Sequence, residues 1–373
     1  MRRYSPILLL LALLGLSGCV EPLVHETPRL YLRIDLPQEY LTKAEIGDEP
    51  SFSDERTLKN LHVWVFKHDD PESATGYYKK FDDLSLIKTG REDIWYLELP
   101  EAVAKAKPNV DVYAIANYNT SFITNISAGN NTTRQQLEAA LVTGFGTASP
   151  VTSVSNNGLP FSAVKKNIPM NGSYPLLELE PLTLVRAVAK ITFLLCQVCV
   201  DDEDKTLVEN YSISNLTIPG NQIRSKEYLF NNTGTSMHIN TDGGFDAAAI
   251  NVSVTELARN PFPDRYSFRS ALYPNETTSQ YGARIQEAID AGLLTRKVYY
   301  LRESDQKLTG SFSYQVGLNP TVNQSFTMSA DGDFARNHDW IVYIYFVADD
   351  IKFSVSWVDW LQGGAHYLTN EGD

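Results

Sequence analysis

Apolar and polar residues alternate in two stretches of this chain. The apolar positions of the first stretch are Leu30, Leu32, Ile34 and Leu36. The apolar positions of the second stretch are Ile351, Phe353, Val355 and Trp357. A period of two predicts a half-buried β-strand, because successive side chains of a strand point to opposite faces of its sheet. We therefore predict amphipathic strands over residues 30–36 and 351–357.

Further apolar runs predict strands throughout the chain. The run LHVWVF at residues 61–66 is apolar on both faces, which indicates a central strand between two layers. The longest strand signal covers residues 182–195. The other predicted strands are residues 110–117, 297–302, 311–316 and 340–347. Many short strands separated by turns are typical of β-sandwiches.

Two segments show helical spacing instead. Thr132 and Thr133 are each followed three residues later by a glutamine, which predicts a short capped helix. Over residues 278–293 apolar residues recur at every fourth position, which predicts a second helix. Two modest helices leave the predicted fold mainly β.

The first residues have the features of an export signal. MRR is followed by an apolar run at residues 7–14 and by LSGC at residues 16–19. This order predicts a lipoprotein signal peptide over residues 1–18, and the apolar run is shorter than the roughly 20 residues of a membrane span. Cys19 is the predicted lipidation site and mature N-terminus, because its thiolate is the nucleophile that accepts a lipid. A secreted chain without the lipid is the alternative.

Length and charge narrow the expected organisation and partners. The chain has 373 residues, which suggests two domains. We place the boundary near Leu182, because the second half repeats the pattern of short strands with one helix. Lys and Arg total 32 against 45 Asp and Glu, and the net charge of -13 repels phosphate backbones. We therefore do not expect nucleic acid as a partner.

The sequence contains no motif for catalysis or for a bound cofactor. The six histidines are scattered without metal-ligand spacing, and no G-x-S-x-G or dinucleotide loop is present. We expect no enzyme, no cofactor and no metal site, although distant carboxylates of the glycosidase type leave no local motif. Acidic clusters such as Asp331-Gly332-Asp333 are interpreted as solvated turns, because the ligand spacing of a calcium loop is absent.

Cys196 and Cys199 form a C-x-x-C spacing. In an extended strand, residues three apart point to opposite faces and lie roughly 10 Å apart, too far for a disulfide. A zinc site needs a second pair, and a redox site needs a neighbouring helix that the sequence does not predict. We interpret both residues as ordinary strand thiols, with a local disulfide or redox role as the alternative.

Several runs along the chain resemble the fimbrillin superfamily. They are IPM at residues 168–170 with Gly172, LTLVRAVAKI at 182–191, VYYLRES at 298–304, and FARNH at 334–338 before a long strand. A final strand that ends at Trp357 or Trp360 also fits. The similarity runs in order from the lipidation motif onward, and no catalytic residues accompany it.

The resemblance implies a mainly β fold of two transthyretin-like β-sandwich domains with a few short helices, preceded by the lipoprotein signal peptide. Fimbrillins are the building blocks of type V pili. The implied ranges are 19–57 for a propeptide with the first strand and a cleavable loop, 58–182 for an N-terminal sandwich and 183–373 for a C-terminal sandwich with a donor-strand region.

Fimbrillins are exported as lipoproteins, and a trypsin-like protease then removes the first strand so that a strand of another subunit fills the vacated groove. The resemblance makes the displaced strand the one with Leu30, Leu32, Ile34 and Leu36. It makes the donor strand the one with Ile351, Phe353, Val355 and Trp357. Arg56, followed by Thr57, is the cleavage candidate, because it ends a polar run where an exposed loop admits a protease; Lys43 is the weaker alternative.

The implied partners are other pilus subunits, the outer membrane through the lipid on Cys19, and the processing protease. The implied location is a surface fimbrium on the outer membrane, with a role in adhesion. An anchor subunit, which keeps its lipid and first strand, and a tip subunit are the alternatives within the class. A glycan-binding surface lipoprotein is the alternative outside it, where Trp95, Trp340, Trp357 and Trp360 would gather on one face rather than in the core.

Overall fold

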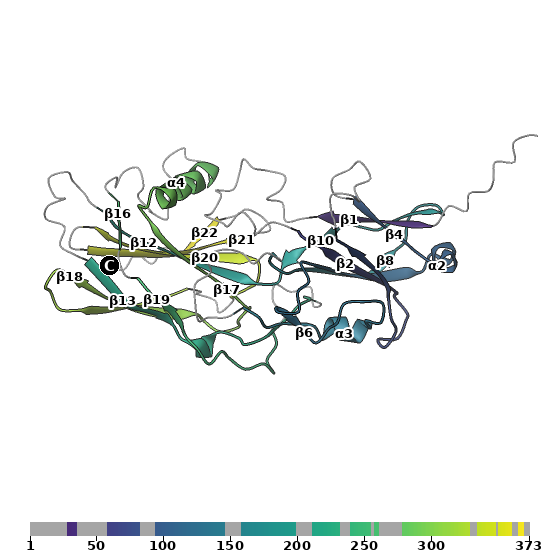
Figure 1. The fold of residues 1–373 in the computed structure, drawn as a ribbon, viewed down its shortest axis with the longest axis horizontal. Coiled ribbons are helices and arrows are strands. Elements are labelled where there is room, and N and C mark those ends of the chain that lie inside the picture. The colour runs from purple at the N-terminus through teal and green to yellow at the C-terminus, as the bar shows by residue number, and fades with distance from the viewer. Residues whose placement is uncertain are drawn as a thin grey trace, which may run out of the picture.

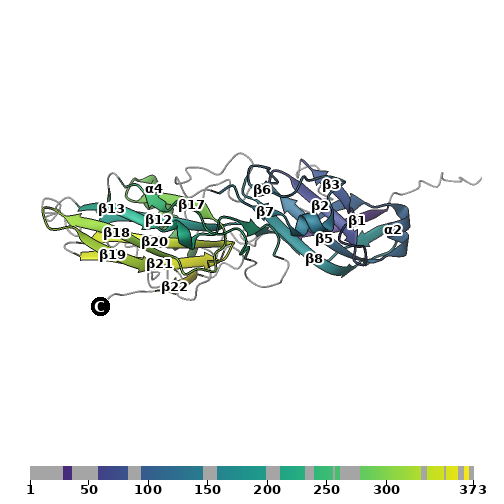
Figure 2. The same cartoon turned by 90° about the horizontal axis from the view of Figure 1, so that it is seen from below.

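The computed structural model of the protein describes residues 28–35, 58–82, 94–145, 158–198, 211–231, 239–254, 257–260, 278–328, 334–347, 350–359 and 365–368. These residues form an elongated, mostly β molecule with two lobes (Figure 1). Strands from the first half of the chain build one lobe, and strands from the second half build the other (Figure 2). The prediction of a mainly β fold is therefore confirmed.

The first lobe contains two sheets. One has the strand order β10-β1-β4, with β9 also paired to β1, and the other has the order β11-β8-β5-β2-β3. The strands are β1 (Arg29–Asp35), β2 (Leu61–Lys67), β3 (Tyr77–Phe81), β4 (Ile94–Glu98), β5 (Asn109–Ala116), β8 (Phe161–Pro169), β9 (Leu176–Glu178), β10 (Leu182–Thr183) and β11 (Val185–Arg186). Apolar side chains of the two sheets share one core, which includes Leu30, Val63 and Leu177.

Strand β2 is the central strand that its sequence predicts. It pairs with β3 on one side and β5 on the other, and its first six residues are all buried. On one face the Trp64 indole Nε1 donates a hydrogen bond to the Gly129 carbonyl at 3.1 Å. On the same face the Arg134 guanidinium lies over the Phe66 ring, 5.3 Å from its centroid. A covering segment on one side and the second sheet on the other explain why the run is apolar on both faces.

The second lobe also contains two sheets. One has the order β16-β12-β20-β21-β22, with β17 also paired to β12, and the other has the order β15-β13-β18-β19. The strands are β12 (Ala189–Val198), β13 (Tyr211–Ile218), β15 (Ile250–Val252), β16 (Ala258–Asn260), β17 (Thr295–Leu301), β18 (Thr309–Val316), β19 (Val322–Thr327), β20 (His338–Val347), β21 (Asp350–Asp359) and β22 (Ala365–Leu368). Their core includes Phe193, Phe312 and Val342.

The described helices are α2 (Glu101–Ala106), α3 (Arg134–Glu138), α4 (Thr278–Asp290) and the 3-10 helix η4 (Gly220–Gln222). Both predicted helices are confirmed, and the cap of α3 is Thr133, which forms a capping box with Gln136. Helix α2 was not predicted, because a single short element behind Pro100 has too few residues to show a period. Within the described residues no helix is long and apolar enough to cross a bilayer.

The prediction of one long strand over residues 182–195 is wrong. The segment is divided into β10, which pairs with β1, β11, which pairs with β8, and β12 in the second lobe. Core membership changes between Val188, in the first core, and Ala189, in the second. The segment is apolar throughout because every part of it is buried, but burial occurs in three different pairings.

A small sheet joins the two lobes. It has the order β14-β7-β6, with β6 (Ile123–Thr124) and β7 (Leu141–Val142) from the first half of the chain and β14 (Glu227–Tyr228) from the second. The Arg302 guanidinium donates to the Arg224 carbonyl at 2.6 Å and to the Thr143 carbonyl at 3.2 Å. Arg336 donates to the carbonyls of Tyr228 and Leu229, at 2.6 and 2.9 Å. Two buried arginines thus hold the backbone of the junction.

A buried group of two carboxyls and one guanidinium lies at this junction. Arg336 Nη2 is 2.6 Å from Glu303 Oε2, and the Glu303 backbone N–H donates to Glu227 Oε2 at 2.6 Å. Glu227 Oε1 is buried and has no hydrogen-bond partner among the described residues. Burial raises the pKa of Glu227 to about 8. The nearby Glu303 carboxylate adds to this rise, and the Arg336 guanidinium offsets only part of it. One cation therefore neutralises one carboxylate, and Glu227 is the neutral acid at pH 7.

We predict that Glu227→Gln flattens the dependence of stability on pH. The pKa of Glu227 is higher in the folded chain than in the unfolded chain, so its stabilising contribution is complete below about pH 4.3, the unfolded pKa, and is lost as pH rises through about 8. The wild-type chain should lose stability relative to the Gln variant between these pH values, by up to about 1.4 kcal/mol per pH unit.

Thermal unfolding of both chains at a series of pH values measures the difference. Asp305→Asn is the control for the loss of one carboxyl, because it removes a carboxylate that is paired with Arg224 but is itself exposed. A constant difference between wild type and Glu227→Gln across the series would contradict the assignment of a neutral Glu227.

Candidate functional site

Strand β1 lies inside its sheet rather than at an edge. It pairs antiparallel with β4, from Arg29 opposite Glu98 to Arg33 opposite Ile94. On its other side it pairs parallel with β9 and then with β10, where Ile34 lies opposite Leu182. In the views of Figures 1 and 2, β1 is the purple strand in the outer part of the first lobe. A segment far from its neighbours in the sequence thus completes this sheet.

The side chains of β1 alternate as the sequence predicts. Leu30 and Leu32 are 0% and 1% exposed and belong to the first core, whereas Arg29 is exposed and Tyr31 is half-buried. The backbone is held at its start, where Arg29 N–H donates to the Pro175 carbonyl at 2.7 Å. Burial of the two leucines contributes about 1.5–3 kcal/mol each to stability.

Removal of β1 would leave a gap inside this sheet. Neighbouring strands lie about 4.8 Å apart, so loss of β1 would leave a gap of roughly 10 Å between β4 and β9. Backbone groups on both strands would then be unpaired. Leu97 and Leu177, which lie opposite Leu30 on these two strands, would lose their buried neighbour. Any strand with apolar residues at every second position restores both the hydrogen bonds and the burial.

The predicted donor segment lies in strand β21 of the second lobe. Strand β21 pairs with β20 over ten residue pairs, from Asp350 opposite Val347 to Asp359 opposite His338, and with β22 over four. Ile351 is half-buried and packs on the second core. Strands β21 and β22 are the last two in the strand order of the six-stranded sheet. The other four strands, β16, β12, β17 and β20, pair with one another without them.

Several predicted site residues lie outside what the structure describes. Cys19, Leu36, Arg56 and Thr57 are outside the described residues, as are Cys199 and the acidic cluster at residues 331–333. For Ile34, Phe353, Val355 and Trp357 the backbone is described and the side chain is not. Cys196 is buried in β12. Within the described residues, no group of three His, Cys, Asp or Glu side chains is arranged to hold a metal ion.

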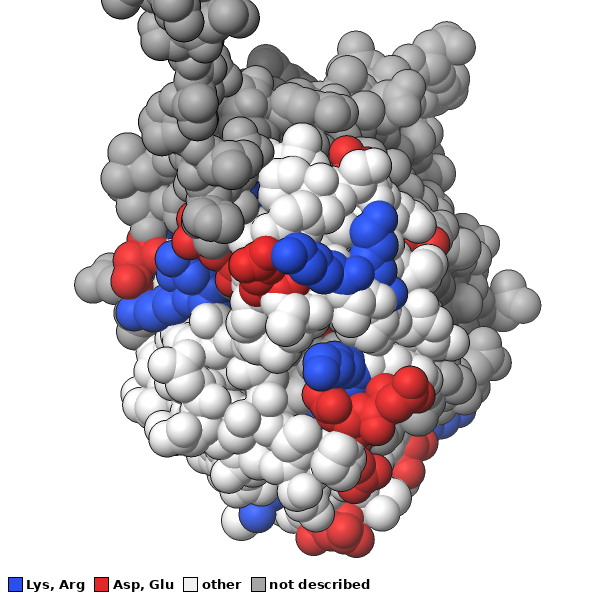
Figure 3. All heavy atoms as spheres, turned by 90° about the vertical axis from the view of Figure 1, so that its right-hand side faces the viewer, with Lys and Arg blue, Asp and Glu red and all other residues white. Residues whose placement is uncertain are grey.

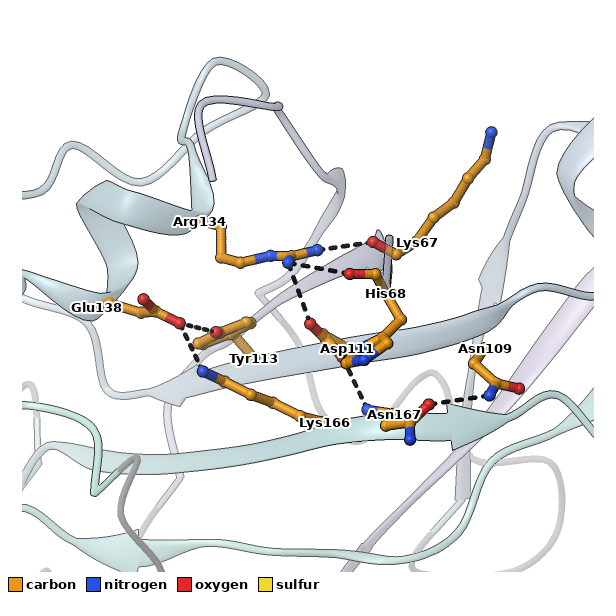
Figure 4. Close-up of polar contacts among 9 residues, drawn as sticks. All are labelled: Lys67, His68, Asn109, Asp111, Tyr113, Arg134, Glu138, Lys166 and Asn167. Atoms are coloured by element: carbon orange, nitrogen blue, oxygen red, sulfur yellow. Dashed lines mark hydrogen bonds and ion pairs between the residues drawn. The ribbon is translucent and has the colours of Figure 1, made fainter. Parts of the chain in front are cut away.

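A polar network that sequence patterns did not indicate lies around Asp111 in the first lobe (Figure 4). The Asp111 carboxylate is 2.7 Å from His68 Nδ1 and 3.4 Å from Arg134 Nη1. It also accepts a hydrogen bond from the Asn167 backbone N–H at 2.7 Å, where the register of β5 and β8 shifts. Asn167 has a φ of 58°, a left-handed conformation that asparagine adopts more readily than most residues. The network thus stabilises a β-bulge and holds α3 on the sheet.

Glu138 extends this network along the same face. Its carboxylate accepts hydrogen bonds from Tyr113 at 2.6 Å and from Lys166 at 2.7 Å (Figure 4). Burial by itself raises the pKa of Glu138, but the bonds from Lys166 and Tyr113 outweigh it and lower that pKa. The participants come from four separate segments of the chain, which is why no sequence motif identifies them. Each contact joins one element of the lobe to another, so the network stabilises the packing of α3 against the sheet.

The outer end of the first lobe carries charges of both signs. Figure 3 shows Lys and Arg next to Asp and Glu on this face, in small groups with uncharged surface between the groups. Lys105 and Glu101, one turn apart on α2, form such a pair at 2.5 Å. Neighbouring charges of opposite sign leave no large field of one sign on this end.

We predict that Leu32→Ala destabilises the first lobe by about 2–5 kcal/mol, because it leaves a cavity between the two sheets. Glu98→Ala on the neighbouring strand β4 removes an exposed side chain and should change stability by no more than about 0.5 kcal/mol. Chemical denaturation of both variants measures the two effects. Equal stability of the variants would contradict the burial of β1.

No protein-family model matches the chain. A search of curated proteins finds no match either. Among solved structures, a candidate cell adhesion protein from Parabacteroides distasonis is 14% identical with a TM-score of 0.50, and the match covers 90% of this chain and 97% of that one. A candidate cell adhesion protein from Bacteroides eggerthii is 13% identical with a TM-score of 0.49, covering 90% and 96%.

A fimbrilin from Porphyromonas gingivalis is also similar, at 12% identity and a TM-score of 0.43, and the match covers 86% of this chain and 90% of that one. At such identities a likeness shows the fold alone. The comparison of folds rests on the structure from Parabacteroides distasonis, with a TM-score of 0.50. These three structures are a fimbrilin and two candidate cell adhesion proteins. The fold that the resemblance to fimbrillins implies is therefore confirmed.

Proposed function

We propose that the chain is a structural subunit of a type V pilus, exported as a lipoprotein and assembled by protease-triggered strand exchange. The observation that carries this proposal is the position of β1 between β4 and β9, with Leu30 and Leu32 buried in the core. A strand from near the start of the chain that fills the middle of a sheet leaves an acceptor groove when it is removed. Its partners are other subunits of the pilus, and its location is the cell surface.

Cleavage after Arg56, ahead of Thr57, is the step that we propose releases β1. Residues 19–57 form the propeptide in this proposal, 58–182 the N-terminal domain and 183–373 the C-terminal domain. The lost burial and backbone pairing make the empty groove unfavourable, which drives the uptake of a strand from another subunit. A trypsin-like protease supplies the cut, because the residue before the cleaved bond is an arginine.

Strands β21 and β22 are the proposed donor region, with Ile351, Phe353, Val355 and Trp357 as the apolar positions. Their place at the end of the six-stranded sheet supports this choice, since they can separate without dividing the sheet. The four apolar side chains at every second position match the spacing that β1 presents to the groove. A role in adhesion follows from the location of a pilus on the cell surface.

Limited trypsin treatment of the full chain tests the proposed release of β1. The wild-type chain should yield a product that begins at Thr57 and forms filaments visible by electron microscopy. Arg56→Ala should suppress both the product and the filaments, whereas Lys43→Ala should suppress neither. A chain that lacks residues 362–373 should be cut normally and remain monomeric, because it lacks β22.

Two results would contradict this mechanism. Filaments built from chains that retain residues 30–36 would favour an anchor subunit, which keeps its first strand. Filaments of normal length from the shortened chain would exclude β22 and the residues after it as the essential donor.

Lipidation at Cys19 is a separate proposal with its own test. Cys19→Ala should leave an unprocessed precursor, because the modified cysteine is the residue at which a lipoprotein signal peptide is removed. Mass spectrometry of the envelope fraction measures the lipid and the N-terminal residue. A mature N-terminus at another residue, with membrane attachment intact, would refute the assignment.

A further inference from the structure

One complete sheet of the second lobe carries no charged residue. Strands β15, β13, β18 and β19 read INV, YSISNLTI, TGSFSYQV and VNQSFT. In the chain as a whole 21% of residues are charged, and the net charge is -13. Two copies of a chain with this net charge repel one another. An uncharged sheet is where this repulsion is weakest.

Strand β19 forms an edge of this sheet. It pairs with β18 over six consecutive residues without a register shift, and no strand of the described chain pairs with its other side. Edge strands expose unpaired backbone N–H and C=O groups, and proteins commonly block them with lysines or bulges. Strand β3, at the edge of the five-stranded sheet in the first lobe, has the exposed lysines Lys79 and Lys80. Strand β19 has no such protection.

The side chains around this edge suit contact with an identical surface. Asn323 and Ser325 are exposed, and amide and hydroxyl groups both donate and accept hydrogen bonds, so each can pair with its own kind. Val322 is 43% exposed and Leu318, in the preceding turn, is fully exposed. A shallow depression of about 350 Å³ over β18 and β19 is lined in part by the hydroxyls of Ser311 and Ser325. Apolar side chains without cover and polar side chains without charge thus lie together.

We propose that β19 pairs antiparallel with β19 of a second copy about a two-fold axis, which joins two four-stranded sheets into one. The edge backbone groups of each copy become the partners of the other, and Leu318 and Val322 are covered. The two-fold axis uses the same edge on both copies, so the contact closes as a dimer. Because no charge lies on these strands, salt strengthens the dimer by screening the repulsion between the remaining surfaces.

Copies of the full chain with two different affinity tags, expressed together, test this pairing. Both carry Arg56→Ala, so that the proposed strand exchange does not bring the copies together. The tagged wild-type edges should copurify. Ser325→Glu on both copies, or Ser325→Lys on both copies, should lower the recovery of the partner about five-fold, because each copy then brings a like charge to the shared edge. A Glu copy expressed with a Lys copy should restore it.

Ser212→Glu on both copies is the matched control, because Ser212 is exposed on β13 inside the same sheet and away from its edge. It should leave copurification unchanged, and thermal unfolding of each variant should match that of the wild type. Failure of the wild-type copies to copurify would overturn the proposal. Loss of copurification in the Ser325 variants without restoration by the Glu and Lys mixture would also overturn it and favour a different partner at this edge.

Discussion

The first lobe depends on the pairing of β1 with two neighbours that it meets only after folding. Strand β4 follows it by about sixty residues and β9 by about one hundred and fifty, yet both pair with the same short segment. Leu30 and Leu32 complete the apolar core between the two sheets of this lobe. Such a strand stabilises the whole lobe, although the chain joins it to the rest of the lobe at one of its two ends only. In the proposed exchange, the two buried leucines and the remote position of this strand in the chain together make its replacement by another strand favourable.

The junction between the lobes is held by buried charges. Arg302 and Arg336 bind backbone carbonyls from both halves of the chain, and Glu303 neutralises Arg336. A buried cation without a partner costs several kcal/mol, so the carbonyls and carboxylates around these two arginines are needed to keep them at the junction. Val298 and Tyr300 of β17 also reach the core of the first lobe. The two lobes therefore share buried contacts as well as a covalent connection.

Charge is distributed unevenly over the two lobes. The first lobe carries exposed lysines on the edge strand β3 and ion pairs at its outer end, whereas the uncharged sheet of the second lobe ends at β19. Strand exchange and edge pairing use different strands, so the two proposed contacts between copies do not compete. One joins subunits through the groove of β1, and the other joins them side by side. A subunit with both contacts can be held in two directions.

Local patterns in the sequence predicted the elements whose cause is local. The alternation at Leu30 and Leu32 gave a strand, and Thr133 with Gln136 gave a helix cap, because periodicity and capping involve residues close in sequence. The break of residues 182–195 into β10, β11 and β12 was not predicted, since every part of that segment is buried and its partners are distant. Asp111 with Arg134, and Glu227 with Glu303, have no local signal at all. The sequence determined where strands form, and only the tertiary structure decided which strands pair and which charges meet, because both depend on contacts between residues far apart in the chain.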